Sequence, residues 1–394
     1  MNTQQILEIE SKHSAGTYAK QPLVIVRGEG ASLFDADGVE YLDCSSGHGV
    51  ANLGHANPKV AEAIYKQAST LITLFESFPN DKRAELMKKL TSLVDGLDRV
   101  FLCNSGTESV EAAFKFARLS TGRKNIVAAM RAFHGRTYGA LSATFNKKYR
   151  EGFEPFVPGF SHVAYNNIEA LEQAVNEETA AVILEVVQGE GGVHPATEEY
   201  MQAARRICDE RGALLIVDEI QSGFGRTGKM FAVQHFDVMP DMLTCAKSLA
   251  GGVPMGAVLI SSKVKNLTPG VHGSTFGGNP LSCAAALAAL SVIEEEDLPR
   301  QALVKGAYLM DKLRRIESPL IREVRGKGLM IGIELKEKVA PYIKELQERN
   351  IIVLNAGMTV IRLLPPLVIT YGQIDRLVGV LTEVLAVEPE LVEA

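Results

Sequence analysis

Short apolar runs alternate with amphipathic stretches through the first three quarters of the chain. This alternation is typical of βαβ units that feed a mostly parallel sheet. Helical patterns cover 109–120 and 199–212, and the runs between them are apolar on both faces, as in strands that helices cover on each side. The pattern predicts strands at 99–104, 125–130, 180–187, 213–220 and 242–247.

The pattern changes after about residue 292. Short apolar runs at 329–336, 351–355 and 360–366 mix with helical patterns over 341–350 and 373–385. This mixture predicts a smaller α+β domain.

The N-terminal segment contains the turn signal DADG at 35–38, which predicts a hairpin that joins the small domain. We therefore expect an α/β protein with three parts. They are an N-terminal segment (1–45), a large domain with a mostly parallel sheet flanked by helices (46–292) and a small α+β domain (293–394).

Composition indicates a globular enzyme and excludes several classes of protein. Hydrophobic residues make up 46% and charged residues 22%, and 41 Lys and Arg face 47 Asp and Glu, a net charge of −6. That balance argues against nucleic acid as a partner. Five scattered cysteines without a C-x-x-C pair argue against disulfides and a metal site. With no signal peptide and no apolar run of membrane length, we expect a cytoplasmic protein that contacts no membrane.

Residues 214–230, LLIVDEIQSGFGRTGKM, resemble nucleotide-binding loops, because 223–229 fits G-x-x-x-x-G-K and its glycines fit G-x-G-x-x-G. A P-loop, however, needs Ser or Thr where Met230 stands. Asp218 and Glu219 directly precede the loop and would repel phosphate, and no good amphipathic helix follows it. A nucleotide-binding oxidoreductase or ATPase stays only as an alternative.

Three segments carry candidate chemistry. Asp218 ends an apolar strand, where α/β proteins place ligands and where a buried charge needs a partner. Asn104–Thr107 precedes a helix, whose first N–H groups suit a phosphate, although a capping box of Ser105 and Glu108 needs no ligand. Lys247 ends another apolar run, either as a surface lysine or as a desolvated amine able to form a Schiff base.

Together these three features are what a pyridoxal phosphate site requires: a phosphate cradle, a carboxylate for the pyridine nitrogen and a Schiff-base lysine. Long segments of the chain then resemble class III (ω-amino) aminotransferases of pyridoxal phosphate fold type I. Within them the chain is most similar to acetylornithine aminotransferases and to the branch whose lysine or ornithine precursors are tethered to an acidic amino-group carrier protein. The segments are YLDCSSGHGVANLGHANPKV, NSGTESVEAAFKFAR, FHGRTYGALS, EVVQGEGGV, VDEIQSGFGRTGK, AKSLAGGVPMGA, HGSTFGGNPL and IRLLPPLVI.

The resemblance implies the roles of the cofactor residues. Lys247 corresponds to the Schiff-base lysine and Asp218 to the partner of the pyridine nitrogen, and Gln221 is expected to face the 3-hydroxyl group. Phe133 is expected to stack on the ring. Thr275 is expected to reach the phosphate in the neighbouring subunit, which implies a homodimer with shared active sites. The phosphate loop corresponds to Ser105, Gly106 and Thr107.

The resemblance also implies a substrate site. Arg136 corresponds to the residue that binds the α-carboxylate of an N-acyl ornithine, and Arg362 to the one that receives the α-carboxylate of 2-oxoglutarate or glutamate. Glu190 corresponds to the carboxylate that pairs with Arg362 when the ω-amino substrate is bound. Ser274 corresponds to a contact of the acylated donor, whereas His48 replaces an aromatic residue near the substrate entrance. An aminotransferase for ornithine or 4-aminobutyrate, or an aminomutase, remains the alternative within the fold.

Basic residues cluster in the sequence near Arg136. We hypothesise that they steer an acidic carrier protein toward the site, the alternative being a solvated run of charge. The residues are Arg123, Lys124, Lys147, Lys148 and Arg150.

Overall fold

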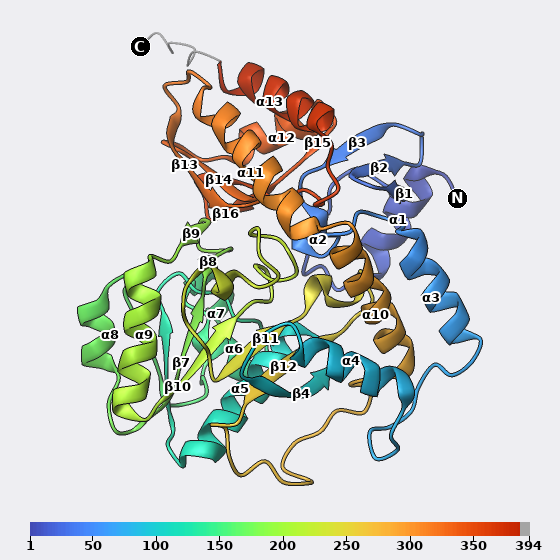
Figure 1. Cartoon of the computed structure of the whole chain (residues 1–394). Coiled ribbons are helices and arrows are strands. Elements are labelled where there is room, and N and C mark those ends of the chain that lie inside the picture. Colours follow the sequence, from blue (N-terminus) through green and yellow to red (C-terminus); the bar gives the residue numbers. More distant parts are fainter. Residues whose placement is uncertain (387–394) are drawn as a thin grey trace.

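The computed structural model describes residues 1–386, so residues 387–394 of the predicted small domain lie outside the described residues. Two lobes can be followed in Figure 1. The larger lobe holds the middle of the chain, and the smaller lobe combines the C-terminal elements with strands from the N-terminal segment. Within residues 1–386, no helix is both long enough and apolar enough to cross a membrane.

A seven-stranded sheet with the order β4-β12-β11-β10-β7-β5-β6 forms the centre of the larger lobe. Only β12 runs antiparallel to its neighbours. All five predicted strands form, with ends shifted by a few residues, and β6 and β12 are additional. The strands are β4 (Leu97–Cys103), β5 (Asn125–Ala129), β6 (Phe160–Val163), β7 (Thr179–Glu185), β10 (Leu214–Asp218), β11 (Met242–Cys245) and β12 (Gly256–Ser261).

Helices cover both faces of this sheet, which explains why its strands are apolar on both sides. Along β7, Ala181 and Ile183 belong to the core that includes α5, whereas Val182 and Leu184 belong to the core that includes α9. All four side chains are buried completely. The helices beside the sheet are α5 (Gly106–Thr121), α6 (Tyr138–Ala143), α8 (Ile168–Ala174) and α9 (Glu198–Arg211).

The remaining elements of the larger lobe lie around the sheet, and α10 leads into the smaller lobe. Helix α10 packs against α3 and α4 and continues toward the smaller lobe, so the proposed domain boundary at 292/293 falls within it. These elements are α2 (Ser46–Gly49), α3 (Pro58–Ala68), α4 (Asp81–Thr91), α7 (Lys147–Arg150), α10 (Pro280–Glu295), β8 (Val187–Gln188), β9 (His194–Pro195) and the 3-10 helices η1 (Ala232–His235) and η2 (Lys247–Ala250).

The smaller lobe contains an antiparallel sheet with the order β13-β14-β17-β16. The N-terminal strands join this lobe because β3 pairs in parallel with β15, with Leu42 opposite Ile351. Figure 1 shows these blue strands beside the red C-terminal helices. The elements are α1 (Thr3–His13), β1 (Ile25–Glu29), β2 (Ser32–Asp35), β3 (Glu40–Asp43), α11 (Leu298–Arg314), β13 (Ile321–Lys327), β14 (Met330–Leu335), α12 (Ala340–Glu348), β15 (Ile351–Ile352), β16 (Leu354–Ala356), β17 (Val360–Leu363) and α13 (Tyr371–Leu385).

Candidate active site

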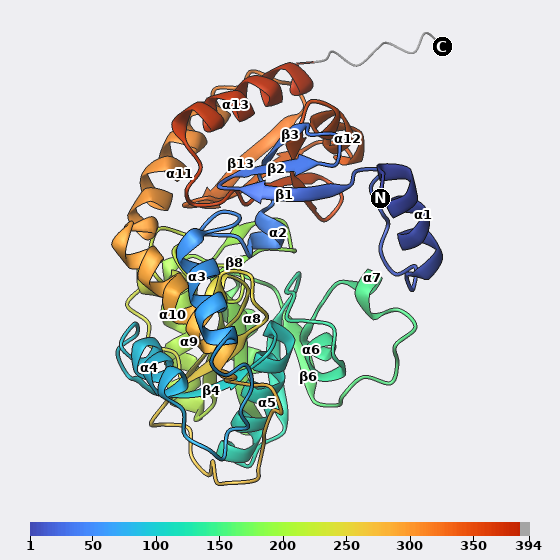
Figure 2. The same ribbon diagram turned by 90° about the vertical axis from the view of Figure 1, so that its right-hand side faces the viewer.

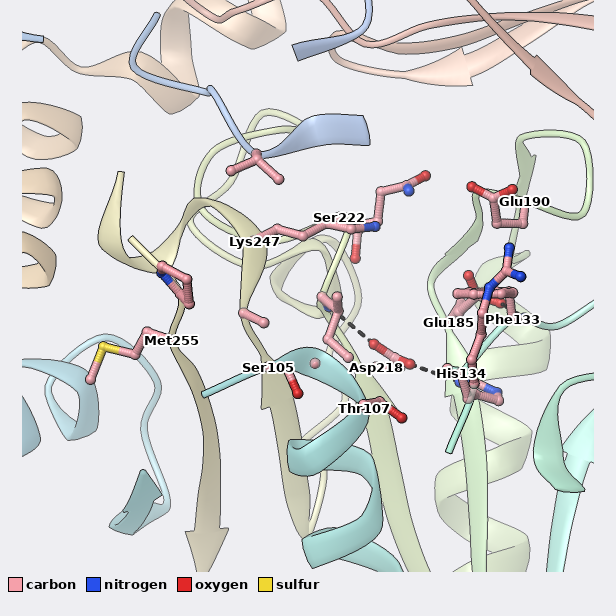
Figure 3. A pocket seen from close by; sticks show the side chains of 18 of the residues that line it. Ser105, Thr107, Phe133, His134, Glu185, Glu190, Asp218, Ser222, Lys247 and Met255 are labelled. Atoms are coloured by element: carbon pink, nitrogen blue, oxygen red, sulfur yellow. Dashed lines mark hydrogen bonds and ion pairs between the residues drawn. The ribbon is translucent and has the colours of Figure 1, made fainter. Parts of the chain in front are cut away.

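A cavity of about 420 Å³ lies where the parallel strands β7 and β10 end (Figure 3). Ligands of α/β proteins bind at this edge of a parallel sheet because loops from several strands converge there. Most of the predicted site residues line this one cavity, although they come from distant parts of the chain. They are Ser105, Gly106, Thr107, Phe133, Arg136, Glu190, Asp218, Gln221 and Lys247.

Asp218 is the last residue of β10 and is almost fully buried. Its Oδ1 accepts a hydrogen bond from the backbone N–H of Ile220 (3.0 Å). Its Oδ2 lies 2.7 Å from Nδ1 of His134, which is buried completely. Burial lowers the pKa of His134, but the hydrogen bond to Asp218 and the charges of Asp218 and Glu185 together outweigh it, and the net shift of the pKa is upward. Asp218 therefore has a partner within the chain that fixes the direction of its carboxylate (Figure 3).

His134 was not predicted from the sequence as a site residue. The one sequence signal for His134 is its position directly after Phe133, which is weak. Its partner Asp218 lies 84 positions away in the sequence. The ring atom Nε2 of His134 is buried and has no hydrogen-bond partner in the described part of the chain.

Glu185, at the end of β7, is a second buried carboxyl group that was not predicted from the sequence. It accepts hydrogen bonds from the backbone N–H groups of Phe133 (3.1 Å) and Gly189 (3.3 Å). Burial raises the pKa of Glu185 to about 7, although His134 acts in the opposite direction. This carboxyl group thus holds two loops of the cavity wall in place.

Lys247 follows β11 and begins the 3-10 helix η2 with a left-handed backbone (φ +36°). A non-glycine residue with that φ is uncommon and marks a position that the surrounding fold constrains. Burial lowers the pKa of Lys247 to about 8, opposed by the charge of Glu190 and supported by that of Arg362. Lys247 therefore provides an amine that is partly neutral near physiological pH.

Helix α5 begins at the cavity. The Ser105 hydroxyl caps the helix by accepting the N–H of Glu108 (3.3 Å), as the capping hypothesis predicts. The carboxylate of Glu108, however, accepts the N–H of Asn104, so the reciprocal half of the predicted capping box does not form. The N–H groups of Gly106 and Thr107 belong to the first turn, which has no intrahelical acceptors, and can serve an anion.

Arg362 lies on β17 of the smaller lobe and is buried completely. Its Nη1 lies 2.6 Å from Oε1 of Glu190 and donates to Oε1 of Gln221 (3.1 Å). Burial raises the pKa of Glu190, but the guanidinium of Arg362 together with the charges of Lys247 and His48 outweighs it, and the net shift is downward. The predicted pair of Arg362 and Glu190 is present, and Gln221 is bound to the same arginine.

Arg136 differs from Arg362 because it is exposed and pairs with no carboxylate within residues 1–386. Its guanidinium carbon lies 4.5 Å from the ring centroid of Tyr149. Tyr149 in turn packs edge-on against Phe133, with 5.3 Å between ring centroids. His48 is also exposed and has a left-handed backbone (φ +64°). Partial desolvation of its ring and the charge of Arg362 lower its pKa.

Ser274 and Thr275 do not line this cavity. They line a separate depression together with Asn104, which borders both. The Ser274 hydroxyl accepts a hydrogen bond from the side chain of Asn104 (2.9 Å). Thr275 is exposed and stays a prediction as a contact of the neighbouring subunit.

The glycine loop 223–229 leads into no α-helix, and Lys229 is exposed, so the loop lacks the geometry of a phosphate-binding loop. Arg226, within the loop, is buried completely and donates to the carbonyl groups of Leu329 and Pro365 and to the side chain of Asn52. The loop ties the two lobes together.

The predicted basic patch forms only in part. Arg123 donates to the carbonyl groups of Thr179 and Arg211, and Arg150 stacks on Phe156 with its guanidinium carbon 4.4 Å from the ring centroid. Both arginines have a structural role, because the guanidinium of Arg123 donates to backbone carbonyl groups and that of Arg150 stacks on an aromatic ring. Lys147 and Lys148, which precede Arg150, are exposed.

The residues around the cavity fit pyridoxal phosphate. An amine of lowered pKa, a buried carboxylate and the first turn of α5 face one space. A Cβ atom at Gly106 would lie 2.9 Å from Cδ1 of Ile220, so any larger residue would displace Ile220, whereas glycine leaves the N–H groups of this turn open. Among residues 1–386, no cluster of side chains is arranged to hold a metal ion.

Comparison with known proteins agrees with this site. The family model described as aminotransferase class-III matches residues 14–385. The [LysW]-aminoadipate semialdehyde transaminase of Deinococcus radiodurans is 53% identical over 98% of this chain and 91% of its own length. The acetylornithine aminotransferase of Methanocaldococcus jannaschii is 46% identical over 98% of both chains.

A solved structure shows the same fold. The ornithine aminotransferase of Toxoplasma gondii, described with partial occupancy of PLP at its active site, superimposes with a TM-score of 0.94 and 35% identity. The match covers 98% of this chain and 94% of that chain. Such full-length similarity contradicts the nucleotide-binding alternatives for the glycine loop. The chain belongs to the class III aminotransferases, which depend on pyridoxal phosphate.

Proposed function

We propose that this transaminase moves the terminal amino group of an N-acylated ornithine or lysine to 2-oxoglutarate, in arginine or lysine biosynthesis. The observation that carries the proposal is the contrast between two arginines beside one cavity. Arg362 is buried and paired with Glu190, whereas Arg136 is exposed and free of carboxylate partners within the described chain. One arginine is free to bind a substrate carboxylate and the other must first release Glu190, and this difference suits two substrates that bind in turn.

The shared cavity supports the proposed roles of the cofactor residues. Asp218 would pair with the pyridine nitrogen, and the N–H groups of the first turn of α5 would bind the phosphate. Lys247 would bond to the aldehyde carbon, and Phe133 would stack on one face of the ring. When bound, pyridoxal phosphate supplies an electron-withdrawing ring that stabilises negative charge on the substrate carbon. His134 keeps the Asp218 carboxylate oriented by its hydrogen bond.

Lys247 is proposed to move the proton. Its amine, with a pKa near 8, can take the proton from the substrate carbon that carries the amino group and deliver it to the C4′ carbon within the same half-reaction. In the second half-reaction it moves a proton in the opposite direction. The half-reactions share one site, which gives ping-pong kinetics.

Arg362 and Glu190 are proposed to select between the substrates. While the acylated donor is bound, Glu190 neutralises Arg362. A bound 2-oxoglutarate or glutamate replaces Glu190 with its own carboxylate, because a guanidinium forms two parallel hydrogen bonds to such a group. Arg136, at the other side, binds the α-carboxylate of the donor, and Ser274 is proposed as a further donor contact.

The donor is proposed to be linked to an acidic carrier protein, with N2-acetylornithine as the second candidate. The relative from Deinococcus radiodurans carries [LysW] in its name, and that from Methanocaldococcus jannaschii is an acetylornithine aminotransferase. We also propose a cytoplasmic homodimer. Free, buried cysteines throughout the described residues support a reducing compartment, and the exposed Thr275 outside its own cavity supports a shared site.

Two experiments test this function. The purified protein is expected to show the visible absorption band of lysine-bound pyridoxal phosphate, which glutamate bleaches, and Lys247→Ala is expected to lack this response. A substrate panel then compares kcat/KM for carrier-linked lysine, carrier-linked ornithine, N2-acetylornithine, free ornithine and 4-aminobutyrate, with 2-oxoglutarate as acceptor. Preferred turnover of free ornithine or 4-aminobutyrate would replace the proposed donor.

A further inference from the structure

A second groove, of about 380 Å³, lies between α7 of the larger lobe and α12 of the smaller lobe. Its lining includes Lys148, Lys338 and Lys344, all exposed, and contains no Asp or Glu. We call it the lysine groove. The chain as a whole carries a net charge of −6, so this concentration of positive charge is a local feature.

Nearby carboxylates neutralise the lysine groove only weakly. Lys344 pairs with Glu348 at 3.7 Å, and both side chains are exposed. Exposed pairs of this kind contribute roughly 0–1 kcal/mol and exchange readily. Glu337, next to Lys338, accepts the hydroxyl of Tyr342. Within residues 1–386, Lys148 and Lys338 form no ion pair, so their charges are available to a partner.

Helix α7 connects the lysine groove to the active site. Consecutive residues of this short helix face different surroundings: Lys148 lines the groove, Tyr149 packs against Arg136, and Arg150 stacks on Phe156. Figure 2 shows α7 on the outer side of the larger lobe, below the N-terminal helix α1. A partner in the groove would therefore lie next to the edge of the cavity at which Arg136 is exposed.

We propose that the lysine groove docks an acidic protein surface that presents the amino donor to the cavity. This rests on the proposed function for the nature of the donor. Three lysines from two lobes complement a cluster of carboxylates, and Met358, 72% exposed in the same lining, adds an apolar contact. Steering by such charges raises the association rate and weakens with salt.

The test compares a K148S/K338S/K344S variant with wild type and with a K88S/K229S/K265S control. The control removes the same charge from exposed lysines that form no ion pair in the described chain and lie outside the groove. For carrier-linked donor, the groove variant is expected to lose about tenfold in kcat/KM, mainly through KM, and most of its salt dependence. Its kcat/KM for N2-acetylornithine is expected to stay within about twofold of wild type.

Equal losses for both donors, or the same loss in the control, would overturn the docking proposal. Binding of the unloaded acidic carrier protein, followed by fluorescence anisotropy at low salt, separates this proposal from the proposed function. If wild type binds the unloaded carrier, the groove variant does not, and the loaded carrier is not turned over, the docking proposal holds and the proposed amino donor is wrong. If wild type does not bind the carrier, or binds labelled RNA and not the carrier, the proposal that the groove docks an acidic protein is wrong.

Discussion

At the scale of single residues, Lys247 shows how burial sets chemistry. Because its pKa is about 8, roughly one amine in ten is neutral at pH 7 and nine in ten at pH 9. Only the neutral amine attacks the aldehyde of pyridoxal phosphate. The rate at which apoprotein takes up the cofactor is therefore expected to rise about tenfold between pH 7 and pH 9 and then level off. Stopped-flow absorbance measures it.

Glu190 provides the control for that profile. Its charge raises the pKa of Lys247, and its removal leaves Arg362 unopposed, so Glu190→Gln is expected to move the midpoint to lower pH. A midpoint that stays in place or moves upward would contradict the assigned interactions. A rate still climbing at pH 10 would show that Lys247 keeps the pKa of an ordinary lysine.

His134 is expected to act on the reaction through Asp218. His134→Phe removes the hydrogen bond to Oδ2 of Asp218, and a bond to a charged group contributes about 1.5–3 kcal/mol. We expect kcat to fall roughly ten- to a hundredfold and the absorption of the bound cofactor to change its pH dependence. His134→Gln, which can still donate, is expected to recover part of both. Unchanged spectra with reduced kcat would mean that His134 has only a packing role.

At the scale of elements, the glycine loop 223–229 gains its importance from Arg226. Replacing Arg226 with Leu leaves the carbonyl groups of Leu329 and Pro365 and the Asn52 side chain without their donor. The free energy of unfolding of the apoprotein is expected to fall by about 3 kcal/mol or more in denaturant titrations. Lys229→Ser, at an exposed position, is expected to change it by less than about 0.5 kcal/mol. A loss for Lys229→Ser as large as that for Arg226→Leu would contradict the structural role of Arg226.

The sequence predicts elements well where burial acts on consecutive residues. β7 and β10 are recognisable because both faces of each strand are covered by helices. β12 was not predicted, and its place between β4 and β11 depends on pairing with residues more than 150 positions away. The partners of Asp218 and Arg226 could not be predicted either, because they too are distant in the sequence. Likewise, sequence proximity places Arg150 in the basic patch but does not show that its guanidinium stacks on Phe156.

At the scale of the whole molecule, the active site depends on both lobes. Arg362 comes from the smaller lobe, whereas Glu190 and Gln221 come from the larger one. Their contacts across the lobes make the position of the smaller lobe part of the substrate site. The proposed role of Thr275 extends the same reasoning to a second subunit, since Thr275 lies outside the cavity of its own chain.

Subunit mixing tests that extension. Thr275→Ala alone is expected to weaken pyridoxal phosphate binding about tenfold, through the loss of one hydrogen bond to a charged group. In a mixed dimer of Lys247→Ala and Thr275→Ala chains, a Thr275 that acts across the interface leaves one site with both defects. The other site then combines Lys247 from one chain with Thr275 from the other and is intact.

Random mixing of equal amounts therefore places intact sites at about a quarter of all positions, because half of the dimers are mixed and each has one such site. The refolded mixture, assayed at limiting pyridoxal phosphate, is expected to show about a quarter of wild-type activity, above either parent. A Thr275 that acts within its own chain gives no intact site, because every chain then carries one of the two defects. Activity no higher than the average of the parents would place Thr275 in its own subunit and end the case for a shared site.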